Sequence, residues 1–405
     1  MKKNHSMLIL NFAAIKIKRK KLFKFAETKK NMASVYLRQA IRSMHTSVGS
    51  GPNFEFAATS CQGWRNTMED VHVIIPYLDG DNTTTQTHQQ QQQQQQSSLF
   101  AVFDGHNGVE VSTYAAKYLP EYIRRNRKYQ NGHIVDGLKE AFILLDNSML
   151  LRESVNELRE IRRMMHPNIP EYTPGFTSGS TAVVCLLKNN TFYCANIGDS
   201  RCVLSRNGRP VPLSVDTKPD DPQEMTRIEH AGGTVMRGRI NMQINVSRAF
   251  GDHMYKCNPD LQLTEQMIIA LPDVIVEPYN EKTDQFMVLM CDGIWNSMTN
   301  DEIIQYIGRR IRTDRLSQIT EDIIRKILPE EMPERGIQGK DNMTIVIIKF
   351  INQATTATNP MMMIGQSTTI TTNVPVQQQN PTTMSQKHSK TNSDRKLKAK
   401  FQPQQ

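Results

Sequence analysis

Two apolar stretches that each end in Asp-Gly constrain the fold of this chain most strongly. The pattern of residues 98–103 predicts a buried strand, and Asp104-Gly105-His106 follow it directly. Residues 286–291 form a similar apolar run, which Asp292-Gly293 follow. An ionised carboxylate is costly to bury unless it is paired or binds a metal, so each strand-end aspartate needs a partner. The repetition predicts that Asp104 and Asp292 belong to one shared site.

The charge of the chain is distributed unevenly. The formal net charge is +9, but residues 1–53 carry twelve Lys and Arg against the single Glu27, and residues 354–405 carry six against the single Asp394. The residues between these ends are therefore net acidic. A net acidic central segment favours a site that binds cations. Any affinity for polyanions is therefore expected in the two basic tails. We therefore expect no specific nucleic-acid binding.

The six cysteines include no C-x-x-C pair and indicate reduced, mostly buried thiols in an intracellular protein.

Residues 7–15 are apolar but too short to span a bilayer, so we expect no transmembrane segment. The basic run at residues 16–21 is consistent with a nuclear address, a membrane-surface patch or a solvated disordered tail. We expect a cytoplasmic or nuclear protein. If translation starts at Met32, the Arg- and Ser-containing residues after it resemble a mitochondrial presequence weakly, which keeps a mitochondrial location as a minority alternative.

The composition divides the chain into three parts. Residues 1–53 form a basic extension that we expect to be largely disordered, residues 54–350 contain the globular domain, and residues 351–405 form a second disordered tail. Within the domain, residues 79–97 form a polar loop insert that includes an unbroken glutamine run at 89–96. The sequence leaves the role of this insert and of both tails open.

Hydrophobic periodicity predicts a mixed order of helices and strands in the globular part. We expect helices at 109–128, bent or split at Pro120, and at 134–165, and a strand meander at 181–187, 191–197 and 201–205. Further helices are predicted at 222–231, 301–312 and 317–327, before a last strand at 343–350.

Acidic residues stand at the ends of four predicted strands: Glu69-Asp70, Asp104, Asp292 and Asp341. If the strand ends meet at one edge, these carboxylates would repel one another unless cations lie between them. Oxygen ligands select hard ions such as Mg²⁺ or Mn²⁺. Two such ions can activate a water for attack on a phosphoryl group. Arg65 has the planar fork that binds phosphate, and His106 could protonate a leaving alkoxide.

Seven ordered motifs carry a family resemblance: Arg65-x-x-Met68-Glu69-Asp70, Phe103-Asp104-Gly105-His106, Gly179-Ser180-Thr181-Ala182, Asn196-Ile197-Gly198-Asp199-Ser200-Arg201, residues 246–252 (Val-Ser-Arg-Ala-Phe-Gly-Asp), residues 291–295 (Cys-Asp-Gly-Ile-Trp) and residues 339–344 (Gly-Lys-Asp-Asn-Met-Thr). Over residues 54–350 the chain closely resembles the metal-dependent serine/threonine protein phosphatases of type 2C. The resemblance implies an α+β fold in which two packed, mainly antiparallel sheets form a β-sandwich flanked by pairs of helices. It also implies a metal site at one end of the sandwich.

The resemblance implies a role for each matching residue. Asp104 would bridge two Mg²⁺ or Mn²⁺ ions, Asp292 and Asp341 would hold the first, and Glu69 with the carbonyl of Gly105 would hold the second. Arg65 would bind the substrate phosphate, His106 would act as general acid, and Asp70 would orient the attacking water. Asp199 matches a ligand of a weaker third metal, and residues 210–238 correspond to a variable flap beside the active site.

Two positions depart from the family pattern. Asn107 replaces a usual glycine, which a turn can accommodate because Asn tolerates left-handed backbone geometry. Asn296 replaces a third-metal aspartate of many relatives, so binding of the third metal should be weaker.

The expected function is hydrolysis of phosphoserine and phosphothreonine in phosphoprotein substrates that take part in signalling. We expect the catalytic domain to be monomeric. The alternative is a pseudophosphatase that uses the same fold as a binding module. The sequence leaves the phosphoprotein substrate unnamed.

Overall fold

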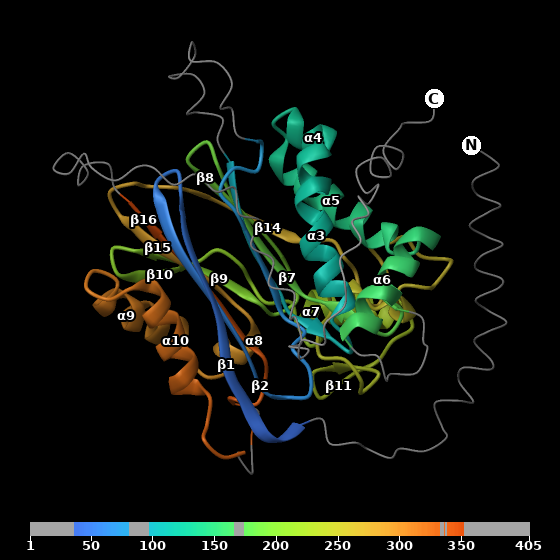
Figure 1. The fold of residues 1–405 in the computed structure, drawn as a ribbon. Coiled ribbons are helices and arrows are strands. Elements are labelled where there is room, and N and C mark those ends of the chain that lie inside the picture. Colours follow the sequence, from blue (N-terminus) through green and yellow to red (C-terminus); the bar gives the residue numbers. More distant parts are fainter. Residues whose placement is uncertain (1–35, 81–96, 166–173, 333–335, 337, 352–405) are drawn as a thin grey trace, which may run out of the picture. The chain divides into compact units, whose positions relative to one another are not determined.

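The computed structural model describes residues 36–80, 97–165, 174–332, 336 and 338–351. Within these residues, two antiparallel β-sheets pack face to face and helices cover the outer face of each sheet (Figure 1). The predicted α+β sandwich is therefore confirmed. Most of the polar insert and the tail after Ile351 lie outside the described residues, so their predicted disorder stays a prediction.

The larger sheet has six strands in the order β1-β2-β16-β15-β9-β10, and every neighbouring pair is antiparallel. Its strands are β1 (Tyr36–Gly51), β2 (Phe54–Arg65), β16 (Met343–Phe350), β15 (Asp284–Met290), β9 (Arg201–Arg206) and β10 (Arg209–Pro212). The second sheet has five strands in the order β14-β8-β7-β4-β3, again antiparallel throughout. These are β14 (Asp273–Pro278), β8 (Thr191–Ile197), β7 (Ala182–Lys188), β4 (Ser97–Phe103) and β3 (Val71–Ile75).

The main hydrophobic core lies between the two sheets. All seven residues of β4 are buried, and so are all residues of β15 except Gln285. A strand that is covered on both faces reads as a continuous apolar run, because neither set of alternating side chains meets water. Phe54 and Phe100 come from opposite sheets, and their rings meet edge to face at 5.1 Å.

Two groups of helices close the sandwich on the outside (Figure 1). The first group contacts the second sheet and comprises α3 (Glu110–Arg125), α4 (Arg127–Gln130), α5 (Ile134–Ser148) and α6 (Arg152–Met165). The second group contacts the larger sheet and comprises α9 (Asn300–Arg310) and α10 (Leu316–Ile327). The short α8 (Asp292–Trp295) follows β15, and α7 (Pro222–His230) lies in the segment between β10 and β14. In the described residues, no helix combines the length and the apolar character that a membrane span requires.

Short elements complete the fold near one end of the sandwich. A three-stranded sheet joins β5 (Gly105–His106), β6 (Gly179–Ser180) and β13 (Phe250–Gly251). A small hairpin joins β11 (Val235–Met236) and β12 (Arg239–Ile240), and one turn of 3₁₀-helix, η2, spans His253–Tyr255. The three-stranded sheet brings together segments that are far apart in the sequence.

The structure differs from the predicted secondary structure at the N-terminal boundary. The basic extension was expected to reach residue 53, but Tyr36–Gly51 form the edge strand β1 on β2. Half of the described β1 side chains face solvent and its sequence is polar, so alternation of apolar residues gave little signal. Its strand conformation is stabilised by pairing with β2, which is a tertiary contribution that propensity does not report.

Two other predictions were wrong in their connectivity. The helix predicted at 134–165 is divided into α5 and α6 at residues 149–151, where Leu150 and Leu151 are exposed. The third strand of the predicted meander, β9, pairs with β15 in the other sheet. The turn that precedes β9 begins at Gly198, whose φ of +91° lies in a region that favours glycine. This turn directs the chain from the second sheet to the larger one. Pro120 lies inside α3 without dividing it.

Candidate active site

The acidic residues predicted from the sequence lie where strands of each sheet end. Val71, which opens β3, pairs with Phe103, which closes β4, so Asp70 and Asp104 lie on adjacent strand ends. In the other sheet, β15 pairs with β16, so Asp292 follows one strand and Asp341 precedes its neighbour. Antiparallel pairing thus brings the end of one strand beside the start of the next.

The glycine after each strand-end aspartate permits a close approach between loops. A Cβ at Gly293 would lie 2.0 Å from the backbone oxygen of Asn342 and 3.3 Å from Cβ of Asp341. A Cβ at Gly105 would lie 2.4 Å from the backbone oxygen of Glu69. The two distances to backbone oxygens, 2.0 and 2.4 Å, are shorter than a Cβ atom can approach without displacing the backbone. The Asp-Gly repeat therefore reflects two places where a second acidic loop contacts the backbone.

Burial and mutual repulsion disfavour the charged forms of these carboxyl groups. Burial raises the pKa of Asp104 well above its usual range, and the negative charges of Asp70, Asp292, Asp341 and Asp199 raise it further. Burial likewise raises the pKa of Asp292 well above the ordinary value, with Asp199 and Asp341 as the next causes. A cluster of this kind is stabilised by cations bound among its oxygens.

Asp70 occupies the most enclosed position of the cluster. Burial raises its pKa to about 7, although Thr344 Oγ1 donates a hydrogen bond of 2.8 Å to Oδ2. Its Oδ1 is buried and has no hydrogen-bond partner among the described residues. Oxygen atoms of Asp70 and Asp104 and the thiol of Cys291 all lie within 4.8 Å of one another. Cys291 was not predicted as a site residue, and only its place in the motif at 291–295 could have indicated it.

A network of hydrogen bonds fixes Glu69. Its Oε1 accepts from Thr67 Oγ1 at 2.7 Å, and its backbone oxygen accepts from Ser112 Oγ at 2.6 Å. Its backbone N–H donates to Asn342 Oδ1 at 2.9 Å. The amide nitrogen of Asn342 donates in turn to the carbonyl oxygens of Gln62 and Thr67. Asn342 thus ties the Glu69 loop to the Asp341 loop, a role that only the tertiary contacts reveal.

Arg65 lies at the more open side of the cluster. Its Nη2 donates a hydrogen bond of 2.6 Å to Asp341 Oδ2, and 37% of its side chain is exposed. The guanidinium carbon lies 5.7 Å from the centre of the Tyr36 ring, which β1 supplies. An exposed, oriented guanidinium beside the acidic cluster is suited to bind an anionic group.

His106 contacts a residue to which the sequence assigned no role. Its Nε2 lies 2.6 Å from Oδ2 of Asp252, the last residue of the motif at 246–252. Burial lowers the pKa of His106, but the charge of Asp252, its hydrogen bond and the charges of Glu69 and Asp199 together outweigh this effect, and the net shift is upward. Arg65 and His106, the two predicted substrate-contacting groups, are thus held by different carboxylates.

Asp199 is paired with a cation of the protein itself. Lys218 Nζ donates to Asp199 Oδ2. Asn296 donates from its amide to Asp292 Oδ2 at 3.1 Å, a bond that an aspartate at this position would not make. Asn107 adopts a left-handed backbone with φ of +58°, in accord with the expected tolerance of asparagine. The sequence did not indicate the contact made by Lys218.

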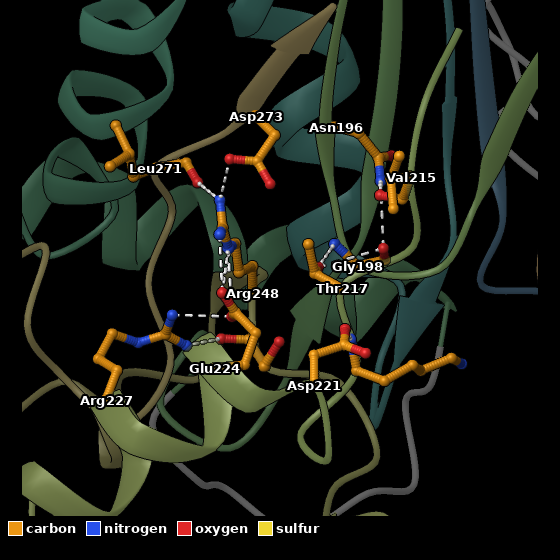
Figure 2. A network of polar contacts seen from close by, with 12 residues as sticks. Asn196, Gly198, Val215, Thr217, Asp221, Glu224, Arg227, Arg248, Leu271 and Asp273 are labelled. Carbon is orange, nitrogen blue, oxygen red and sulfur yellow. Dashed lines mark hydrogen bonds and ion pairs between the residues drawn. The ribbon is translucent and has the colours of Figure 1, made fainter. Parts of the chain in front are cut away.

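The segment predicted to form a flap is anchored by a buried ion-pair network, which Figure 2 shows. Arg248 Nη2 donates to Glu224 Oε1 at 2.7 Å, and Arg227 Nη1 donates to Glu224 Oε2 at 2.7 Å. Arg248 Nη1 also donates to Asp273 Oδ1 at 2.8 Å. Glu224 and Arg227 belong to α7, so Arg248 connects this helix to the start of β14.

Hydrogen bonds also connect the start of the flap segment to the Asp199 turn (Figure 2). The backbone N–H of Thr217 donates to the carbonyl oxygen of Gly198 at 2.9 Å, and Gly198 N–H donates to Thr217 Oγ1 at 2.9 Å. Asn196 donates to Val215 O at 2.9 Å. These bonds place Lys218 beside Asp199.

All six cysteines lie in described segments and are free thiols. Five of them are buried and Cys257 is half-buried, as the sequence predicted. Cys185 and Cys194 are directly opposite one another on β7 and β8.

Comparison with known proteins identifies the class of this fold and site. The family model described as Protein phosphatase 2C matches residues 54–332. The chain belongs to the protein phosphatase 2C family, and it is a protein phosphatase by this membership.

Individual relatives support the same assignment. The chain is 36% identical over 318 residues to "Probable protein phosphatase 2C 4" of Paramecium tetraurelia, covering 77% of this chain and 97% of that protein. It is 34% identical to "Probable protein phosphatase 2C 21" of Arabidopsis thaliana over 77% of this chain and 91% of the relative. Its fold is similar to the crystal structure of a phosphatase from Toxoplasma gondii, with a TM-score of 0.56, 23% identity, and coverage of 77% and 96%.

Proposed function

We propose that this protein hydrolyses phosphoserine and phosphothreonine in phosphoproteins and that the reaction depends on two Mg²⁺ or Mn²⁺ ions. The observation that carries the proposal is the gathering of buried and half-buried carboxylates at adjacent strand ends, with the raised pKa values of Asp104 and Asp292. Such a cluster is unfavourable by itself and becomes favourable when divalent cations bind.

The donor set supports hard divalent ions. The acidic side chains offer carboxylate oxygen, and Oδ1 of Asp70 is a buried oxygen that lacks a hydrogen-bond partner among the described residues. Asp104 would bridge the two ions, Asp292 and Asp341 would hold one, and Glu69 with the carbonyl of Gly105 would hold the other. The bound ions would supply an activated water and would neutralise charge on the phosphoryl group. Asp199 would contribute to a weaker third site, which its pairing with Lys218 and the presence of Asn296 disfavour.

The protein's own residues would position the substrate and move the proton. Arg65 would bind the phosphate through its planar fork, since its guanidinium is partly exposed and oriented by Asp341. Asp70 would orient the attacking water through its carboxylate. His106 would donate a proton to the serine or threonine oxygen as its bond to phosphorus breaks.

The test is phosphate release by the full-length protein from an aryl phosphate and from a phosphothreonine peptide. We expect turnover with Mn²⁺ or Mg²⁺ and none with a chelator. Ca²⁺ added in place of Mn²⁺ is a control for non-specific ion effects. A pseudophosphatase would bind the phosphopeptide and release no phosphate with any ion, and that result would overturn the proposal.

A further inference from the structure

The contact between His106 and Asp252 is built by the three-stranded sheet. His106 in β5 pairs with Gly179 in β6, and Gly179 pairs with Gly251 in β13. Asp252 follows directly on β13. Three segments separated by at least 70 residues therefore converge to place Nε2 of His106 2.6 Å from Oδ2 of Asp252.

Gly179 leaves the space in which the two side chains meet. A Cβ at this position would lie 2.2 Å from Asp252 Oδ2 and 2.6 Å from His106 Nε2. Even a methyl group would therefore displace the imidazole, the carboxylate or both. The contact between His106 and Asp252 therefore requires a glycine at position 179. Glycine otherwise weakens a strand, so its presence here is explained by this contact.

Asp252 is held in an unfavourable environment. Its residue exposure is 0%, its Oδ1 is buried without a hydrogen-bond partner among the described residues, and its φ is +50°. The neighbouring basic side chains are directed elsewhere, because Lys256 Nζ donates to Asp146 at 2.8 Å and His253 Nε2 lies 3.6 Å from Asp146. A buried carboxylate with an unsatisfied oxygen and left-handed backbone is costly to fold. Such costs are concentrated at functional sites.

We propose that Asp252 is a positioning residue that fixes the ring orientation of His106 and keeps a proton on Nε2. The carboxylate accepts a hydrogen bond from Nε2–H, so Nδ1 of the doubly protonated ring is the nitrogen left to face the substrate. This inference rests on the proposed function and deepens it. In the reaction, the bond from phosphorus to the serine oxygen breaks, and that oxygen takes the proton from Nδ1. Water supplies the oxygen that binds phosphorus, and one of its protons restores the imidazolium form of His106.

The kinetic test is a double-mutant cycle. It measures the effect of Asp252→Asn in the wild-type protein and again in the His106→Ala variant. With His106 present, we expect Asp252→Asn to lower kcat on a phosphothreonine peptide by about tenfold to a hundredfold, with KM changed little. The loss should be smaller on an aryl phosphate, whose leaving group needs less protonation. With His106→Ala, the same substitution should have no further effect, because the group it positions is gone.

Asp146→Asn is the matched control, since Asp146 is also a buried carboxylate but contacts His253 and Lys256. Its Oδ1 accepts the Gly251 N–H at 2.8 Å, a hydrogen bond that the asparagine oxygen can keep. We expect it to lower thermal stability without changing the ratio of activity on the two substrates. If Asp252→Asn lowers kcat equally with and without His106, Asp252 has only a structural role and the inference is wrong. If the wild type has no metal-dependent turnover, the proposed function fails instead.

A measurement independent of turnover uses isotope-labelled histidine and NMR of the protein without metal. The His106 signal, identified by its loss in His106→Ala, should report a proton on Nε2 in the wild type. The proton should redistribute toward Nδ1 in Asp252→Asn. If that variant does not fold, Gly179→Ala tests the same contact without changing a charge. An unchanged His106 signal in the folded variants would overturn the inference.

Discussion

Arg65 and Asp341 form a hydrogen-bonded ion pair of 2.6 Å between the end of β2 and the loop before β16. The pair joins the proposed phosphate-binding group directly to a proposed metal ligand. Because both side chains are partly exposed, the pair adds little to folding stability. Its main consequence is the orientation of the guanidinium.

We expect Arg65→Lys to lower kcat/KM on a phosphopeptide by roughly tenfold to a hundredfold, the equivalent of about 1.5–3 kcal/mol for a charge-assisted hydrogen bond. A lysine can still pair with Asp341, but it lacks the planar fork. Steady-state kinetics with saturating Mn²⁺ measures the effect. Arg309→Lys, at an exposed position of α9, serves as the control and should behave as the wild type. Unchanged kcat/KM in Arg65→Lys would contradict the assigned role.

We expect Asp292→Asn to remove turnover and to raise the melting temperature of the metal-free protein. Burial and neighbouring carboxylates raise the pKa of Asp292, so its charged form destabilises the fold at neutral pH. Loss of that charge should raise the melting temperature by about 2–4 °C for each kcal/mol of relieved repulsion.

The measurement is thermal unfolding of both proteins in chelator and in excess Mg²⁺. The wild type should gain more stability from Mg²⁺ than the variant does. Asp301→Asn, at an exposed position, controls for a general effect of removing a negative charge. An Asp292→Asn protein that is less stable in chelator would argue against repulsion within the cluster.

His72 should make the fold sensitive to mild acid. It is fully buried in β3, and burial lowers its pKa from 6.5 to about 4. Because the folded-state pKa lies below the unfolded value, the unfolded chain binds the proton first as the pH falls. The stability is therefore complete above pH 6.5 and is lost progressively toward pH 4, by up to about 3 kcal/mol.

Denaturant unfolding of wild type and His72→Gln between pH 7.5 and 4.5 measures this contribution as the difference between their pH slopes. Carboxyl groups of the acidic cluster titrate in both proteins, so their effect cancels in the difference. His133→Gln, at an exposed position, should keep the wild-type slope. Equal slopes for wild type and His72→Gln would refute the prediction.

Two partners of Arg248 should differ greatly in their contribution to stability. Glu224 is buried and binds both Arg248 and Arg227, whereas the side chain of Asp273 is 57% exposed. We expect Glu224→Gln to destabilise the protein by about 3 kcal/mol or more, because it leaves buried guanidinium groups without their counter-charge. Asp273→Asn should cost less than about 1 kcal/mol. Limited proteolysis and denaturant unfolding test the difference, and similar losses in both variants would contradict it.

The sequence alone predicted which acidic residues gather at the strand ends, because each of them stands in a local motif. Asp104 and Asp292 each follow an apolar strand, and this pattern is visible without knowledge of their partners. Their role as metal ligands stays a prediction. The α+β class was implied by the resemblance that the seven motifs carry, and the structure confirms it. The apolar runs of β4 and β15 by themselves predicted only buried strands.

Only the tertiary structure decided which distant residues complete that site. β1 is a strand because it forms backbone hydrogen bonds with β2. β9 lies in a different sheet from β8 because it pairs with β15. Asp252 reaches His106 across a sheet of three short segments, with Gly179 providing the space between them. Local propensity and periodicity report how a segment folds, but they carry no information about which segment it will contact, and these contacts depend on pairing and packing across the whole domain.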